Sequence, residues 1–134
     1  MALILLRHGS AGDRDDWADD DSERPLDAKG VRQARELVER LAGVPISAIH
    51  TSPYRRCVQT VAPLAEARRL EPLLRPELAE GSAAEGHALV RALAGEDVVV
   101  CGHGGLERAL VDPPKWRKGA AFVVDAGLRV EDVL

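Results

Sequence analysis

Residues 2–6 form a continuous apolar run, Ala2-Leu3-Ile4-Leu5-Leu6, which constrains the fold more than any other feature of the chain. A strand with one solvated face alternates apolar and polar residues, whereas a strand covered on both faces is apolar throughout. A second run of this kind contains Val98-Val99-Val100. We therefore predict buried strands in a parallel or mixed sheet that helices cover on each side.

The rest of the chain alternates predicted strands with predicted helices. The valine-rich strand is expected at residues 97–101, and further strands are expected at residues 46–50, 73–74, 121–124 and 128–130. Asp27 is the predicted N-cap of a first helix that ends at Gly43 and presents Val31, Ala34, Val38 and Leu41 on one face. A second helix is predicted to open with Ser52 as N-cap and Pro53 as its first residue. Residues 82–94 are predicted to form a third helix, and a short helix follows Gly105. This order predicts an α/β fold, a three-layer α-β-α sandwich with a mostly parallel central sheet.

Composition excludes several classes of protein. A chain of 134 residues with 46% hydrophobic and 30% charged residues is typical of one globular domain, here residues 1–134. The net charge of −4 argues against a sequence-independent nucleic-acid binder, which carries a basic excess. No run of 18 apolar residues predicts a membrane span, and the apolar start is too short for a signal peptide. We expect a cytoplasmic protein that contacts neither nucleic acid nor membrane.

No cofactor or metal is expected from the candidate ligands. Cys57 and Cys101 lack the spacing of a zinc site and are predicted to be small buried residues. Residues 13–23 carry seven acidic side chains opposed only by Arg14. A solvated loop is the ordinary interpretation of such a run. A divalent-metal site is the alternative, but the Asp-x-Asp-x-Asp-Gly pattern is missing.

Three polar clusters lie just past predicted strands. They are Arg7-His8-Gly9, Ser52-Pro53-Tyr54-Arg55-Arg56 and Gly102-His103-Gly104-Gly105. Parallel strands would bring all three clusters to one edge of the sheet, where ligand sites of such folds lie. Arginines bind phosphate oxygens through charge-assisted hydrogen bonds, and a neutral imidazole can attack phosphorus. The clusters together therefore favour phosphoryl chemistry, although each alone is compatible with an ordinary turn or a capped helix.

The combination resembles the histidine phosphatase superfamily, the phosphoglycerate-mutase-like fold. The resemblance rests on the three clusters, on the continuation Cys57-Val58-Gln59-Thr60, and on Arg24-Pro25-Leu26-Asp27-Ala28-Lys29-Gly30, which is similar to a segment of small phosphohistidine phosphatases of the SixA type. It covers roughly residues 1–110. It implies that His8 is the nucleophile, that Arg7, Arg56 and His103 form the phosphate pocket, and that no metal takes part.

The resemblance also orders the remaining candidates. The pattern Ser-Pro-x-x-Arg selects Arg56 rather than Arg55, and a Leu-x-Glu pattern selects Glu80 as general acid with Glu77 as runner-up. Ser10 is a candidate phosphate ligand, with a turn-stabilising role as the equal alternative. His50 is expected to be structural or partly buried and His87 solvent-exposed, because neither lies in a motif.

The expected reaction is removal of a phosphoryl group through a phosphohistidine intermediate on His8. Little spare length separates the motifs, so an open, shallow pocket is expected, which suits a phosphorylated protein side chain such as phosphohistidine. A small phosphomonoester is the alternative. Residues 117–124 are similar to the tail of histidine phosphatase domains fused to Nudix hydrolases, which implies a nucleotide substrate. A non-catalytic phosphate-binding module is a third hypothesis.

Overall fold

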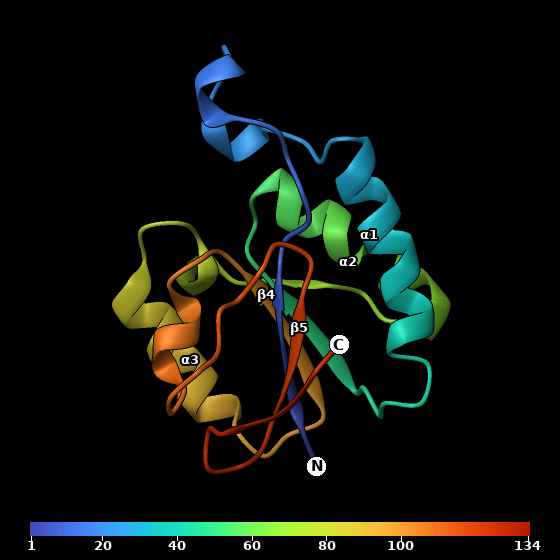
Figure 1. The fold of residues 1–134 in the computed structure, drawn as a ribbon, viewed down its shortest axis with the longest axis vertical. Helices are drawn as coiled ribbons and strands as arrows, with labels where there is room; N and C mark the ends of the chain where they lie inside the picture. The colour runs from blue at the N-terminus through green and yellow to red at the C-terminus, as the bar shows by residue number, and fades with distance from the viewer.

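The computed structural model describes all residues, 1–134, and shows one sheet between two helical layers (Figure 1). The strands are β1 (Leu3–Arg7), β2 (Ala48–Thr51), β3 (Leu73–Leu74), β4 (Val98–Gly102), β5 (Ala121–Val124) and β6 (Val130–Val133). Their order in the sheet is β3-β2-β4-β1-β5-β6. The first four of these strands are parallel, whereas β5 and β6 are antiparallel to their neighbours. The predicted α/β fold with a mostly parallel sheet is confirmed.

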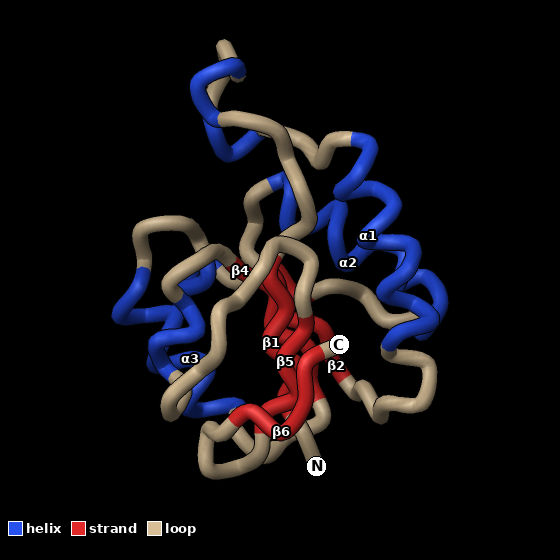
Figure 2. The backbone as a smooth tube through the Cα atoms, viewed as in Figure 1, coloured by secondary structure: helices blue, strands red, loops and turns tan.

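Two helices cover one face of the sheet and one helix covers the other, as the tube in Figure 2 shows. The first pair is α1 (Ala28–Arg40) and α2 (Arg55–Arg68), and the third helix is α3 (Ala83–Leu93). Short 3-10 turns complete the chain: η1 (Arg14–Asp16), η2 (Asp21–Glu23), η3 (Pro76–Leu78) and η4 (Leu106–Ala109). No helix is both long enough and apolar enough to cross a membrane.

The apolar strands supply two cores, one on each face. Leu3 and Leu5 of β1 pack on the α3 side, while Ile4 and Leu6 pack on the α1 and α2 side. Residues of β4 alternate in the same way, and all five of them are buried. Both central strands are therefore apolar up to their carboxyl ends, where β1 finishes with Arg7, because each face of the sheet is covered.

Several predicted boundaries differ from the structure. Helix α2 begins at Arg55 rather than at Pro53, because the backbone of Tyr54 is still extended (φ −60°, ψ 137°). The Ser52 hydroxyl accepts a hydrogen bond from the Tyr54 amide in the turn before the helix. Helix α1 has its predicted cap, with the Asp27 side chain accepting from the Gly30 amide, but it ends at Arg40. Of the residues predicted to face inward, Ala34 and Leu41 are buried and Val38 is half-buried, whereas Val31 is exposed. Leu37 is buried in addition. Strand β6 begins at Val130, two residues later than predicted.

Gly30 allows α1 to approach the turn that follows β1. A Cβ atom at position 30 would collide with the carbonyl group of Ser10. The Asp27 amide donates to this same carbonyl oxygen at 3.0 Å, so the contact is fixed from both sides. Glycine is thus required at position 30, because the backbone of α1 passes too close to the backbone of Ser10 for any side chain to fit between them.

We predict that Gly30→Ala lowers the free energy of unfolding by roughly 1–3 kcal/mol, because backbone must move to admit the methyl group. Gly43→Ala is the matched control, since a Cβ there meets nothing within 4 Å. It should change the unfolding free energy by less than about 0.5 kcal/mol. Urea unfolding of both variants measures the difference. Equal effects would contradict the close approach.

Candidate active site

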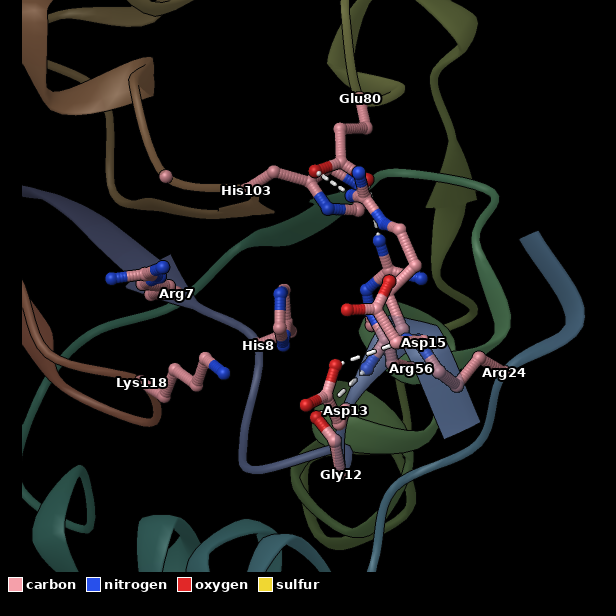
Figure 3. A pocket seen from close by; sticks show the side chains of 12 residues that line it. Arg7, His8, Gly12, Asp13, Asp15, Arg24, Arg56, Glu80, His103 and Lys118 are labelled. Atoms are coloured by element: carbon pink, nitrogen blue, oxygen red, sulfur yellow. Dashed lines mark hydrogen bonds and ion pairs between the residues drawn. The ribbon is translucent and has the colours of Figure 1, made fainter. Parts of the chain in front are cut away.

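The two motif histidines lie at the same edge of the sheet because β1 and β4 are parallel neighbours. Arg7 pairs in register with Gly102, so the residues that follow them, His8 and His103, leave the sheet side by side. Their ring centroids are 5.4 Å apart. Figure 3 shows both rings within one pocket, together with Arg7, Arg56 and Glu80.

His8 has a defined tautomer. Its Nδ1 atom lies 2.7 Å from the Gly9 carbonyl oxygen. A carbonyl oxygen can only accept, so Nδ1 carries the hydrogen and Nε2 keeps its lone pair. Burial lowers the pKa of His8 to about 3, partly opposed by the Gly9 hydrogen bond and reinforced by the electrostatic influence of His103, Arg56 and Arg7. His8 is therefore a neutral imidazole at physiological pH, with Nε2 free to act as a nucleophile.

His103 is held through its Nε2 atom, whereas His8 is held through Nδ1. Its Nε2 atom lies 2.9 Å from the Ser52 hydroxyl and 3.6 Å from the Cys57 sulfur. The edge of the ring packs against Tyr54, with centroids 4.8 Å apart. Nδ1 of His103 is buried and has no protein partner. The ring is thus fixed on one side, and Nδ1 is the atom available to a ligand.

Two arginines provide further donors. Arg7 is anchored by a 2.7 Å hydrogen bond from Nη1 to the Trp116 carbonyl oxygen. Arg56 is fully buried and donates from Nη1 to the Asp21 carbonyl oxygen at 2.8 Å. The Nε atoms of both arginines are buried without a partner. Each guanidinium is therefore fixed in place but keeps a donor unused, as expected of groups that bind an oxyanion.

Carboxylates neutralise part of the arginine charge. Arg56 Nη2 donates to Asp21 Oδ2 at 3.0 Å and to Glu80 Oε2 at 2.6 Å. The other Glu80 oxygen accepts from Arg14 at 2.8 Å, and the other Asp21 oxygen accepts from Arg24 at 2.9 Å. Desolvation opposes ionisation of Asp21, but the hydrogen bonds and charges of Arg24 and Arg56 outweigh it and lower the pKa of this carboxyl to about 2. One wall of the pocket is thus a network of compensated ions.

The pocket has a volume of about 520 Å³, and no hydrophobic residue lines it. Its twelve lining residues are Arg7, His8, Gly12, Asp13, Arg14, Asp15, Arg24, Arg56, Glu80, His103, Gly104 and Lys118. A volume of this size is in the range that holds a small-molecule ligand. Because no apolar side chain lines the pocket, it favours a charged ligand over a hydrophobic one.

The structure brings together five of the six residues predicted for the site: Arg7, His8, Arg56, Glu80 and His103. Ser10 does not line the pocket. Its hydroxyl donates to the Asp27 carboxylate at 2.6 Å, so it stabilises the turn beside α1 rather than reaching the pocket. This outcome matches the alternative role considered for Ser10.

The residues outside the motifs are placed as follows. Glu77, the runner-up acid, pairs with Arg75 at 2.9 Å and does not line the pocket. His50 is buried, as expected. His87 is half-buried rather than exposed, since its Nε2 lies 3.0 Å from the Gly105 carbonyl oxygen. Cys57 and Cys101 are buried free thiols, as predicted, and form no disulfide.

Sequence reasoning missed six charged residues at this site: Asp13, Arg14, Asp15, Asp21, Arg24 and Lys118. The acidic composition of residues 13–23 predicts a solvated loop, and most of these residues are exposed, but Asp21 is half-buried against Arg24 and Arg56. No group of three or more His, Cys, Asp or Glu side chains is arranged to hold a metal ion. The Arg-Pro-Leu segment contained a signal for Arg24, whereas nothing local to the sequence distinguishes Lys118 from its neighbours.

Comparison with known proteins gives the family. Residues 3–92 match the family model of the histidine phosphatase superfamily (branch 1), and the chain belongs to this superfamily. A solved structure of the protein histidine phosphatase SixA in complex with tungstate is similar, with a TM-score of 0.80 and 25% identity, over 100% of this chain and 96% of that one. Bacillus stearothermophilus YhfR shares the fold with a TM-score of 0.75 and 19% identity, over 97% of this chain and 96% of that one.

A longer relative is also similar. The 8-oxo-(d)GTP phosphatase of Mycolicibacterium smegmatis is 35% identical over 141 residues, which cover 91% of this chain and 43% of that protein. The chain spans about half the length, or less, of the curated relatives it matches. Membership of the superfamily supports a phosphatase activity, and the relatives differ in the phosphorylated compounds named for them.

We predict that Arg56→Ala lowers kcat/KM by roughly 10²–10³, the effect typical of losing one preorganised oxyanion donor. Arg55→Ala should leave kcat/KM nearly unchanged, because Arg55 is exposed on the next face of α2. Arg56→Lys should recover only part of the loss, since an ammonium group cannot reproduce the planar donor set. Steady-state kinetics on the three variants, with thermal unfolding to check the fold, measure this. A larger loss for Arg55→Ala would contradict the assignment.

Proposed function

We propose that the protein is a metal-independent phosphatase that transfers a phosphoryl group to His8 and then to water. The observation that carries the proposal is the fixed tautomer of His8, which leaves a neutral Nε2 lone pair in a pocket of unpartnered donors. Arg7 Nε, Arg56 Nε and His103 Nδ1 are three such donors or potential donors. They suit the oxygens of a phosphoryl group, on which negative charge is spread in the transition state.

The proposed reaction has two steps. Nε2 of His8 attacks phosphorus, the bond from phosphorus to the leaving atom breaks, and the leaving group keeps the bonding pair. A water molecule then attacks the phosphohistidine, the bond from phosphorus to Nε2 breaks, and inorganic phosphate departs while the water loses a proton. His8 returns to its neutral tautomer because the Gly9 carbonyl oxygen holds the hydrogen on Nδ1 throughout.

Glu80 is the proposed proton donor to the leaving group and acceptor from the water. It is the carboxyl group of the Leu-x-Glu pattern that lines the pocket, and it touches Arg56. A phosphate that binds Arg56 would compete with Glu80 for the guanidinium and repel its negative charge. The protonated carboxyl group is the form that can act as an acid. Glu77 points instead to Arg75 and is not proposed for this role.

We predict that His8→Ala abolishes hydrolysis of an aryl phosphate and the vanadate-sensitive part of the activity, because no other neutral nucleophile is held at this position. Rapid quenching of the wild-type protein with radiolabelled substrate should trap an acid-labile, base-stable phosphoprotein that His8→Ala lacks. Circular dichroism checks that the variant is folded. Activity of the variant within about tenfold of wild type would refute the nucleophile. Ligand binding without any turnover in wild type would favour a non-catalytic phosphate-binding module.

Two substrate classes have support. Phosphohistidine on a protein is favoured by the similarity to SixA along the whole chain. It is also favoured by the polar pocket, which can bind a phosphorylated side chain without contacting any other part of the protein substrate. A nucleotide is favoured by the 35% identity with the 8-oxo-(d)GTP phosphatase. Comparison of kcat/KM for a phosphohistidine peptide, nucleoside phosphates and sugar phosphates would distinguish these classes.

We predict that Glu80→Gln slows hydrolysis of alkyl phosphates by roughly 10²–10⁴, because an alkoxide leaving group needs a proton. Nitrophenyl phosphate should be slowed much less, since nitrophenolate leaves without one. Glu77→Gln is the matched control and should leave both substrates unaffected. The measurement is kcat for the two substrates in each variant. Equal slowing of both substrates by Glu80→Gln would mean that Glu80 holds the geometry of Arg56 instead.

A further inference from the structure

Positive charge in the pocket is unevenly compensated. Arg14, Arg24 and Arg56 all form ion pairs with Asp21 or Glu80. Arg7 and Lys118 take part in none of the ion pairs of the molecule. Figure 3 shows these two on one side of the His8 ring, with Arg24, Arg56 and the labelled acids on the other. The Lys118 ammonium group points toward His8 in this view.

The backbone fixes Lys118 beside the nucleophile. The amide of Gly119, the next residue, donates to the carbonyl oxygens of both Arg7 and His8, at 3.1 and 3.0 Å. The Lys118 carbonyl oxygen accepts from Gln33 at 3.2 Å, and the Gly119 carbonyl oxygen accepts from Arg40 at 2.9 Å. Although the Lys118 side chain is exposed, its Cα is therefore tied to the end of β1.

Two acidic residues make the other side of the pocket, away from Lys118, unfavourable for further negative charge on a substrate. Asp13 and Asp15 line the pocket on the side away from Lys118 (Figure 3). Neither forms an ion pair, so each would repel a negatively charged group placed near it. A substrate with negative charge beyond the transferred phosphoryl group is thus attracted to the Arg7 and Lys118 side and repelled from the other.

We propose that Lys118 is a specificity-determining residue that binds an anionic group next to the transferred phosphoryl group, so that the preferred substrates are phosphoanhydrides such as nucleoside di- and triphosphates. The inference rests on the proposed function and deepens it. The transferred phosphoryl group is already served by Arg7, Arg56 and His103. The volume of about 520 Å³ leaves room for a second phosphate, and the polar lining offers nothing to a nucleobase, which would lie outside.

The chemistry of such a substrate fits this arrangement. Nε2 of His8 attacks the terminal phosphorus, the bond to the bridging oxygen breaks, and that oxygen keeps the electron pair as part of a shorter phosphate. Water then releases inorganic phosphate from His8. The bridging oxygen leaves as a stabilised anion and needs no proton, so the charge of Lys118 takes the place of acid assistance. A phosphohistidine substrate has no anion at this position and gains nothing from Lys118.

The test compares Lys118→Met, which removes the charge and keeps the length, with Lys115→Met, an exposed lysine of the same loop that does not line the pocket. Calorimetry with inorganic pyrophosphate and with orthophosphate measures binding to the full chain without turnover. Wild type should bind pyrophosphate more tightly than orthophosphate. Lys118→Met should weaken pyrophosphate binding about tenfold, the value of one charge-assisted hydrogen bond, and orthophosphate binding less than about twofold. Lys115→Met should change neither.

Kinetics add a second readout. The KM for a nucleoside diphosphate should rise about tenfold in Lys118→Met, while kcat/KM for phenyl phosphate and for a phosphohistidine peptide falls by less than about twofold. Lys115→Met should leave all three values unchanged. Equal losses for mono- and diphosphates, no loss for either, or no preference of wild type for pyrophosphate would each overturn the inference. Absence of hydrolysis of every phosphorylated compound by wild type would instead refute the proposed function, while the calorimetry still decides the role of Lys118.

Discussion

The parallel register of β1 and β4 at the centre of the sheet is the constraint on which the site depends. Because Arg7 pairs with Gly102, the chain turns out of both strands at the same level and delivers His8 and His103 together. The backbone amide of His8 also donates to the Gly102 carbonyl oxygen at 3.2 Å, so the pairing continues up to the nucleophile. Any shift of this register would move the backbone of His8 away from that of His103 and so separate the two imidazole rings.

Buried Arg56 makes a second demand on the structure. A guanidinium without water needs anionic partners, and Asp21 and Glu80 come from segments far apart in the chain to provide them. Arg24, itself held by the carbonyl oxygens of Ala11 and Gly12, carries Asp21 into place. The loop of residues 13–23 is therefore bound to the sheet through the same charges that form the pocket. On the other side of His8, Arg7 and Lys118 remain without such partners.

Much of this arrangement was predictable from the sequence. Apolar runs covered on both faces identified β1 and β4. The polar clusters past three predicted strands supplied Arg7, His8, Arg56 and His103, and the family resemblance added Glu80. The failures have physical causes. Ser52 is a residue type that often caps helices, but here its hydroxyl accepts a hydrogen bond from the Tyr54 amide and also bonds to His103, 51 residues away in the chain. Asp21 and Lys118 reach the pocket only through tertiary contacts of their loops, and no local spacing encodes such contacts.

The neutral state of His8 has a consequence for the acid stability of the fold. In the unfolded chain this imidazole takes up a proton below its ordinary pKa of 6.5, whereas in the folded protein it resists protonation until about pH 3. The unfolded state therefore binds more protons across this interval, and folding loses stability as pH falls from 6.5 toward 3. Burial, aided by the charge of Arg75, lowers the pKa of His50 and acts in the same direction. Keeping the nucleophilic imidazole neutral thus lowers the stability of this fold in acid.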